Sequence, residues 1–232
     1  MISRRNILEF FKTVELKGHF VYASGKHGTA YLDKRRLCTG EKIQTICREM
    51  VCRFNASFLY ETETVVGPEN GGIIISQLTA QCIRQRTKRR IWSVYADETK
   101  GGRFLINKSY AKFVSGKKVL VVDDILTTGG SVKSVLEALD ENGADILGVA
   151  VLCNRGRVTA ETLNVPELFS LVDYDLDSWT EQECKKSGPC SKNIPVNQDF
   201  GHGRDFLIHK AQEDVVGAAN KAMREVFKGG RK

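Results

Sequence analysis

Hydrophobic and polar residues alternate along this 232-residue chain in blocks that predict strands and helices in turn. Short aliphatic runs are typical of strands buried on both faces of a parallel sheet, and they occur at residues 64–66, 91–95, 119–122, 146–152 and 168–172. Between them, apolar residues recur at helical spacing, which predicts helices at residues 41–54, 73–83 and 132–139. This alternation predicts an α/β fold with a central, mostly parallel sheet flanked by helices.

The two ends of the chain show other patterns. Residues 3–16 predict an amphipathic helix with Ser3 as its N-cap, and residues 19–37 predict a small hairpin with Lys26 at its glycine-flanked tip. Residues 211–227 predict a further amphipathic helix. We therefore expect three parts: a helix and hairpin over residues 1–40, a core over residues 41–175, and a C-terminal extension over residues 176–232.

Charge and cysteine usage narrow the class of protein. With 35 basic and 28 acidic residues the net charge is +7, which suits anionic substrates such as phosphates. The densest basic run, residues 84–90, is typical of a solvated helix end, so we do not expect nucleic-acid binding. Seven cysteines scattered through apolar patterns, and no run of 18 apolar residues, predict a soluble cytoplasmic protein without membrane association.

The most informative stretch is residues 119–131, which read VLVVDDILTTGGS. Two acids, Asp123 and Asp124, follow the aliphatic run, and a series of small residues then opens the next helix: Thr127, Thr128, Gly129, Gly130 and Ser131. Glycine lets the backbone approach a ligand, and the N–H groups that begin a helix favour a phosphate. Acids beside a phosphate site indicate a ligand with hydroxyl groups, a metal or both, whereas a plain strand and capped helix remain the alternative.

This stretch resembles the phosphoribosyl diphosphate (PRPP) signature of the type I phosphoribosyltransferases. The resemblance implies that the acid pair lies under the ribose hydroxyls and that residues 127–131 wrap the 5-phosphate. A second glycine-rich turn follows the strand at residues 64–66, and the family binds pyrophosphate there. The residues that the resemblance assigns to pyrophosphate are Glu69, Asn70, Gly71 and Gly72. Taken alone, the turn is also compatible with a plain strand-to-helix connection.

A polar connection of about 20 residues, 96–116, is typical of a functional lid or a disordered segment. In the family, a flexible loop at this place closes over the reaction centre. Lys100 and Arg103 flank two glycines and are the cations that we expect to neutralise the departing pyrophosphate. With Asp124 they form the expected catalytic group.

The N-terminal helix and hairpin are similar to the hood of the orotate phosphoribosyltransferases. The resemblance implies that Lys26 lies near the base, and Arg155, which follows the strand at 146–152, is a second candidate for base binding. Each is equally compatible with a solvated surface position, and residues 34–36 (KRR) are expected to form a strand end or a subunit contact. Two departures stand out: the family's pyrophosphate turn carries a lysine where this chain has Gly71, and the lid here has one lysine and no histidine.

The resemblance implies transfer of ribose 5-phosphate from PRPP to a nucleobase, orotate or a related pyrimidine, as in pyrimidine biosynthesis. It also implies Mg²⁺ held through PRPP rather than by protein ligands, and a homodimer. Two alternatives stay open. The turn that contains Glu69 is similar to the adenine-type turn, which favours a purine phosphoribosyltransferase. The reduced lid and the positive charge favour a non-catalytic PRPP-binding regulator.

The segment after residue 176 carries one further candidate site. Cys184, Cys190 and His202 are a possible zinc set, although their spacing matches no common structural zinc site. The alternative is a C-terminal extension that packs on the domain or on a partner without metal.

Overall fold

The computed structural model describes residues 3–40 and 42–229. Its contacts divide the chain into two compact units, which we call the core unit (residues 3–14 and 32–175) and the hairpin unit (residues 15–31 and 176–229). The expected three-part division differs from this one, because the hairpin groups with the C-terminal segment while the helices on either side of it group with the core. For the helix expected over residues 41–54, the predicted first residue, Glu41, lies outside the described residues.

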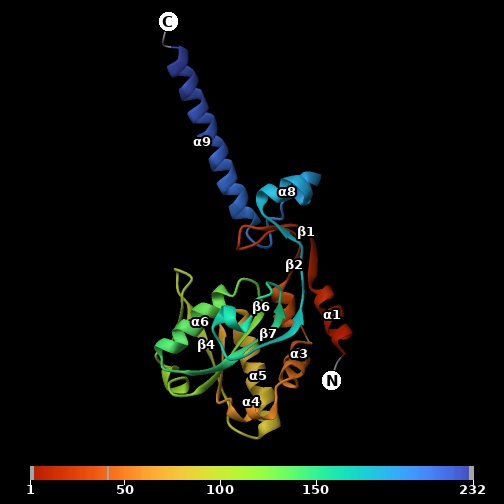
Figure 1. Ribbon diagram of the computed structural model, residues 1–232, viewed down its shortest axis with the longest axis vertical. Coiled ribbons are helices and arrows are strands. Elements are labelled where there is room, and N and C mark those ends of the chain that lie inside the picture. The colour runs from red at the N-terminus through yellow and green to blue at the C-terminus, as the bar shows by residue number, and fades with distance from the viewer. Residues whose placement is uncertain (1–2, 41, 230–232) are drawn as a thin grey trace. The chain divides into compact units, whose positions relative to one another are not determined.

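The core unit is built on a six-stranded sheet in the order β5-β4-β3-β6-β7-β8 (Figure 1). Five strands are parallel, and β5 pairs antiparallel with β4. The strands are β3 (Thr64–Pro68), β4 (Trp92–Glu98), β5 (Phe104–Ile106), β6 (Lys118–Leu126), β7 (Asp145–Asn154) and β8 (Leu168–Asp173). The mostly parallel α/β architecture expected from the sequence is therefore confirmed.

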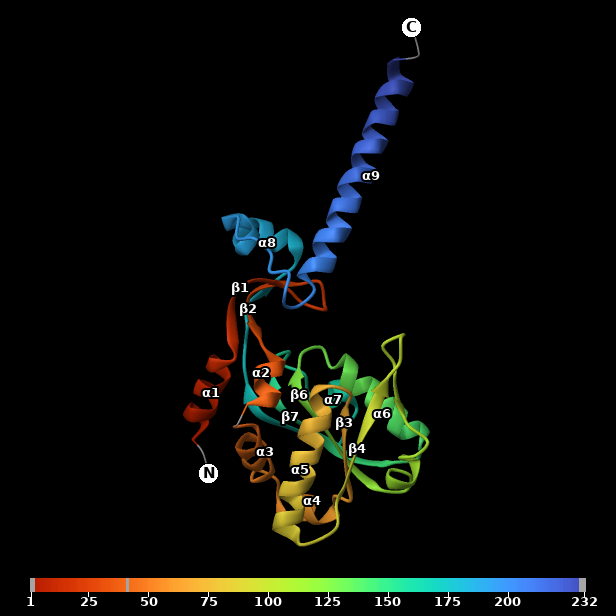
Figure 2. The same cartoon turned by 180° about the vertical axis from the view of Figure 1, so that it is seen from behind.

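Helices cover both faces of this sheet, as Figures 1 and 2 show from opposite sides. Helix α5 packs on β3, β4 and β6 and is itself contacted by α3, while α6 packs on β5, β6 and β7. The helices of the core unit are α1 (Arg4–Thr13), α2 (Lys34–Thr39), α3 (Ile43–Val51), α4 (Ala56–Glu61), α5 (Gly71–Thr87), α6 (Gly130–Glu141) and α7 (Ala160–Leu163), with a 3₁₀ turn η1 at Ala111–Phe113. Covering both faces explains why the strands read as continuous aliphatic runs.

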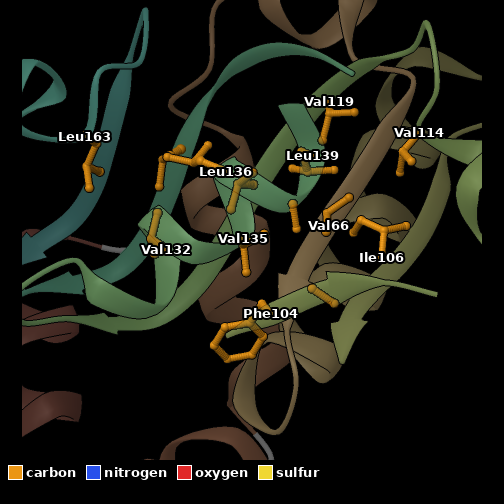
Figure 3. Close-up of a cluster of buried hydrophobic side chains, with 14 of the residues drawn as sticks. Val66, Phe104, Ile106, Val114, Val119, Val132, Val135, Leu136, Leu139 and Leu163 are labelled. Atoms are coloured by element: carbon orange, nitrogen blue, oxygen red, sulfur yellow. The ribbon is translucent and has the colours of Figure 1, made fainter. Parts of the chain in front are cut away.

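The cluster of buried side chains beneath α6 shows how the strands divide their residues between the two faces (Figure 3). Val119 and Val121 of β6 belong to this cluster, whereas Leu120 and Val122 are equally buried but do not. Successive strand residues point to opposite faces, so the second pair faces the α5 side. Because β6 is packed on both faces, the turn that follows its carboxyl end starts from a fixed position.

Two expectations at the edges of the core were wrong or incomplete. The strand end expected at residues 34–36 is wrong: these residues start α2, because the Asp33 side chain caps that helix by accepting from the N–H groups of Arg35 and Arg36. The alternative of a subunit contact stays a prediction. The connection 96–116 contains regular structure, since β4 and β5 form a hairpin and Phe104 and Ile106 are buried, and its role as a lid stays a prediction. The tip of the β4–β5 hairpin at residues 100–103 is exposed.

The hairpin unit contains a three-stranded sheet in the order β1-β2-β9, with β1 (Glu15–Val21), β2 (His27–Leu32) and β9 (Ser178–Trp179). Helix α8 (Glu181–Ser187), a 3₁₀ turn η2 (Pro189–Lys192) and the long helix α9 (Gly203–Gly229) complete it. The predicted hairpin is confirmed, and the predicted C-terminal helix begins eight residues earlier than the expected Ala211. Of the helices in the described part of the chain, none has the length and apolar character needed to span a bilayer.

Candidate active site

The acid pair lies near the carboxyl end of β6, one of the two central strands of the core sheet. Asp123 and Asp124 are 7% and 1% exposed, and the strand continues past them to Leu126. Asp123 Oδ1 accepts the N–H of Asp124 at 2.8 Å, and Asp124 Oδ1 accepts the N–H of Ile125 at 2.6 Å. These backbone bonds hold each carboxylate in one orientation, so the two acids are a preformed feature of the sheet edge.

Lys34 lies against this acid pair, which the sequence did not indicate. Its Nζ is 3.6 Å from Asp124 Oδ1, and its side chain is 57% exposed while that of Asp124 is 1% exposed. The Asp33 cap starts α2 at this place and thereby points Lys34 toward the end of β6. A cation beside two buried carboxylates offsets their mutual repulsion and remains accessible to a ligand.

The predicted phosphate loop joins β6 to α6. Gly129 adopts φ 81° as the residue before the helix, and no side chain caps the N-terminus that begins at Gly130. The first N–H groups of a helix have no partner within the helix, so at an uncapped start they are available to an anion. The geometry supports the phosphate role that the sequence predicts for residues 127–131.

The turn that follows β7 is hydrogen-bonded to the residue that precedes the predicted phosphate loop. The N–H groups of Arg155 and Gly156 both donate to the carbonyl oxygen of Leu126, at 2.8 and 3.1 Å. A Cβ added to Gly156 would lie 1.4 Å from the carbonyl oxygen of Thr127. Sequence analysis missed Gly156, since a glycine after a strand is ordinary and its packing partner is far away along the chain.

The second glycine-rich turn meets the acid pair. Asn70 has φ 74° and ψ −106°, a conformation that costs residues with side chains about 1–3 kcal/mol and that is concentrated at functional sites. Helix α5 then starts at Gly71 without a side-chain cap, and a Cβ at Gly71 would lie 2.2 Å from Asp124 Oδ2. In this structure the Asp124 carboxylate occupies the space that a side chain at residue 71 would enter, so the lysine that the family carries there would require this carboxylate to move.

Glu69 fixes the position of this turn. Its backbone N–H donates to the carbonyl oxygen of Ala96, and its carboxylate Oε2 accepts the N–H of Glu98 at 2.8 Å. The side chain thus joins the turn to the end of β4. In this structure Glu69 organises the backbone donors of the turn, and Asn70 is exposed beside them.

The two expected lid cations differ in their surroundings. Lys100 is exposed at the tip of the β4–β5 hairpin. Arg103 forms an ion pair with Glu141, the last residue of α6, which is about 16 Å along the helix from the phosphate loop at its start. Lys100 thus keeps its expected role as a prediction, and Arg103 would have to leave Glu141 to act on pyrophosphate.

The two candidate base-binding residues lie in different units. Lys26 is exposed at the tip of the β1–β2 hairpin, where the carbonyl oxygen of Lys26 accepts the N–H of Tyr22 at 2.8 Å. Arg155 is half-buried at the carboxyl end of β7, directly beside the phosphate loop. Base binding by both residues remains a prediction.

No activated thiol accompanies the acid pair in the described part of the core unit. Cys38 Sγ lies 3.9 Å from Asp124 Oδ2 and 4.0 Å from the carbonyl oxygen of Gly71. Burial and the two neighbouring acids raise the pKa of Cys38 to about 12, so its thiol stays neutral. The site therefore offers anion cradles, carboxylates and an amine, which suits charge stabilisation rather than attack by a protein nucleophile.

The buried acids predict a pH-dependent stability. Burial, followed by the charge of Asp124, raises the pKa of Asp123 above its ordinary value, while Lys34 acts in the opposite direction. The folded state therefore keeps a proton that the unfolded chain loses above about pH 4, and stability from this group falls as the pH rises toward the folded pKa. We expect the urea midpoint to be higher at about pH 5 than at about pH 8, with a slope of at most about 1.4 kcal/mol per pH unit from one group.

The variant Asp123→Asn tests this expectation, because an amide has no proton to lose. Its urea midpoint should change less between the two pH values than that of the wild type. Equal pH dependence in both proteins would show that Asp123 is already ionised at low pH.

The comparisons with known proteins bear on this geometry. A family model described as "Phosphoribosyl transferase domain" matches residues 39–186, which is more than half of the chain. The matched residues include the acid pair, both glycine-rich turns and the tip of the β4–β5 hairpin. The chain belongs to the phosphoribosyltransferase family. It is therefore a pentosyltransferase.

Relatives of this phosphoribosyltransferase carry one activity in their names. An orotate phosphoribosyltransferase of Thermotoga maritima is 32% identical over 188 residues, which cover 81% of this chain and 92% of the relative. An orotate phosphoribosyltransferase of Desulforamulus reducens is 34% identical over 198 residues, covering 84% and 95%. The similarity thus spans nearly the whole length of these enzymes.

Solved structures support the fold. An orotate phosphoribosyltransferase from Aeropyrum pernix has a TM-score of 0.54 at 22% identity and covers 80% of this phosphoribosyltransferase and 99% of its own chain. The Mycobacterium tuberculosis orotate phosphoribosyltransferase in complex with PRPP has a TM-score of 0.53 at 21% identity, covering 73% and 95%. The adenine phosphoribosyltransferase of Saccharomyces cerevisiae has a TM-score of 0.54 at 17% identity. The fold is therefore shared by enzymes that act on different bases.

Proposed function

We propose that this phosphoribosyltransferase transfers ribose 5-phosphate from PRPP to orotate or a related pyrimidine and releases pyrophosphate. The names of its relatives over most of the chain support the choice of base. The observation that carries the proposal is the pair of uncapped helix starts, at Gly71 and Gly130, that follow the neighbouring strands β3 and β6, with Gly71 directly against the Asp124 carboxylate.

Each part of this arrangement suits one part of PRPP. The α6 start with its small residues suits the 5-phosphate, and the α5 start suits the pyrophosphate. Asp123 and Asp124 suit the ribose hydroxyls between the two, since a carboxylate accepts hydrogen bonds from both hydroxyls of a diol. Lys34 would lie beside the sugar and balance the charge of Asp124.

The reaction needs charge stabilisation and positioning. Breaking the bond between the anomeric carbon and pyrophosphate builds positive charge on the ribose and negative charge on the leaving group. The acid pair would stabilise the ribose, while the N–H groups of the α5 start and the lid cation would stabilise pyrophosphate. A nitrogen of the base attacks the anomeric carbon, and no covalent intermediate with the protein is required.

We further propose Mg²⁺ as the cofactor, a homodimer as the assembly and the cytoplasm as the location. The carboxylates of the acid pair are hard oxygen donors that fit Mg²⁺, but Lys34 already lies 3.6 Å from Asp124, so we assign the ion mainly to oxygens of PRPP. Bound there, it would neutralise pyrophosphate. Family resemblance supports the dimer, and the free cysteines of the chain support a reducing compartment.

Replacement of Lys100, the predicted lid cation, should lower turnover more than PRPP affinity. Lys100→Ala should lower kcat about tenfold or more while changing the PRPP dissociation constant by less than about threefold, because its charge is needed most as pyrophosphate leaves. Initial rates and calorimetric PRPP titration measure the two quantities. Lys108→Ala, an exposed lysine just after β5, is the matched control. Equal losses in kcat and affinity would make Lys100 a ground-state binding residue instead.

The proposed activity is tested by incubating the full chain with PRPP, Mg²⁺ and one base at a time, with pyrophosphate release as the readout. We expect turnover with orotate to exceed turnover with uracil, adenine and hypoxanthine. Turnover with purines alone would replace the proposal by purine transfer. Tight PRPP binding without turnover on any base would replace it by a PRPP-binding regulator.

A further inference from the structure

Four metal-ligating side chains converge in the hairpin unit, away from the PRPP loops in the sequence. His19 and His27 come from β1 and β2, and Cys184 and Cys190 come from α8 and η2. Their ligand atoms all lie within 4.8 Å of one another. Three of these residues are buried and Cys190 is partly buried. The cluster therefore joins parts of the chain that are more than 150 residues apart.

The distances within the cluster fit a tetrahedral ion of zinc size. Bonds of about 2.0–2.1 Å to nitrogen and about 2.3 Å to sulfur imply nitrogen–sulfur separations of about 3.6 Å. Cys190 Sγ lies 3.7 Å from His19 Nε2 and 3.6 Å from His27 Nδ1, and Cys184 Sγ lies 3.9 Å from His19 Nε2. The two histidine nitrogens are 2.7 Å apart, so binding would require them to separate by about 0.6 Å.

Surrounding groups orient the ligands. His19 Nδ1 lies 2.7 Å from the carbonyl oxygen of Ile194, and donation of its proton there leaves the Nε2 lone pair directed into the cluster. The polar contacts of His27 involve its Nδ1. Its Nε2 is buried and has no hydrogen-bond partner among the described residues. The contact of His19 with the carbonyl oxygen of Ile194 is of the kind that usually accompanies a histidine ligand of a metal, and His27 has no such contact among the described residues.

The two sulfurs are arranged in the same way. The backbone N–H of Cys190 donates to Cys184 Sγ at 3.2 Å, which would stabilise a thiolate there. A Cβ at Gly188 would lie 2.8 Å from Cys184 Sγ, so the absence of a side chain lets the turn fold closely around the sulfur. Cys184 and Cys190 are both free thiols.

The size of the hairpin unit supplies a reason for a metal. It consists of a short hairpin and a C-terminal segment, and residues 211–220 of α9 are exposed, with Val215 and Val216 59–69% exposed. A unit with so little apolar surface to bury commonly depends on a metal or disulfides for its stability. Two thiolates and two imidazoles in a closed, buried set are the ligands of a structural zinc site rather than a catalytic one.

We propose that His19, His27, Cys184 and Cys190 bind one structural zinc ion that ties the β1–β2 hairpin to the C-terminal segment. This replaces the set expected from the sequence, because His202 is exposed and lies 3.6 Å from Asp205 rather than in the cluster. The two cysteines of that expected set remain, and the histidines come from the other end of the chain.

Zinc content of the full chain, purified under reducing conditions, tests the site. We expect about one zinc per chain by elemental analysis, and at least a fivefold loss in Cys184→Ser, Cys190→Ser and His27→Ala. The controls Cys52→Ser and His202→Ala should keep the wild-type content, since Cys52 lies in the core unit and His202 lies outside the cluster. Retention of zinc by both cysteine variants, or its loss from His202→Ala, would overturn the assignment.

A second measurement uses the unmodified chain and does not depend on whether a variant folds. Wild-type protein freed of metal by a chelator should take up one Co²⁺ per chain and show the intense visible absorption of tetrahedral cobalt bound to thiolates. Absence of this spectrum, or a disulfide between Cys184 and Cys190 in metal-free protein as purified, would refute the proposal. Neither readout depends on enzymatic activity, so the result is independent of the proposed function.

Discussion

Asp124→Asn is expected to lower kcat/KM for PRPP by about 10²–10³, which corresponds to a loss of about 2.7–4 kcal/mol in transition-state stabilisation. The asparagine has nearly the same shape but offers one acceptor oxygen instead of two and no charge. It would therefore lose a hydrogen bond to a ribose hydroxyl and the attraction to the developing positive charge on the ribose. Steady-state rates with PRPP varied, together with a PRPP titration, measure the effect.

The fold of this variant should survive. Asp124 is buried beside Asp123, so removing its charge removes a repulsion, and Lys34 is 57% exposed and stays hydrated without its partner. Asp145→Asn is the matched control, because Asp145 is an exposed acid at the opposite end of a neighbouring strand. Unchanged kinetics in Asp124→Asn, with the control also unchanged, would refute the assignment of the acid pair to the ribose.

Gly156→Ala is expected to weaken PRPP binding at least tenfold and to lower the free energy of unfolding by about 1–3 kcal/mol. The added methyl group would lie 1.4 Å from the Thr127 carbonyl oxygen, closer than any non-bonded contact, so one of the two backbones must move. Movement of either would disturb the two N–H donors that hold the Leu126 carbonyl oxygen and would shift the start of the phosphate loop. Binding is affected because the phosphate N–H groups must converge on one point.

PRPP titration and urea unfolding measure the two effects of Gly156→Ala. Gly217→Ala is the control, because this glycine lies in α9 with nothing within 4 Å of its added Cβ, and alanine is favoured there by about 0.5–1 kcal/mol. A Gly156→Ala protein with normal PRPP affinity would mean that the phosphate loop does not depend on its contact with the turn after β7.

Much of the fold and of the PRPP site was predictable because the signals are local. The aliphatic run at residues 119–122 predicted β6, and the small residues after it predicted the glycine-led start of α6. The hairpin expected around Lys26 is also present. In each case neighbours in the sequence create the pattern, so periodicity and turn chemistry are sufficient to find it.

Contacts between distant residues were not predictable in this way. Lys34 was expected at a strand end, because its helix is only six residues long and shows no apolar periodicity. The ion pair of Arg103 with Glu141 was not predictable either, because it follows from the antiparallel pairing of β5 with β4 and the packing of β5 along α6. The possible zinc set lay within one segment of the sequence, whereas two of the four residues of the proposed set come from the first 30 residues.

The sequence by itself determined the α/β class and predicted the acid pair and phosphate loop at residues 119–131, since strand, turn and helix start are properties of adjacent residues. The tertiary structure decided which groups stand beside that stretch: Lys34 against Asp124, the Gly71 backbone against the same carboxylate, and Gly156 beneath Thr127. These contacts depend on strand order and register, which bring together residues whose separation in sequence leaves no periodic signal.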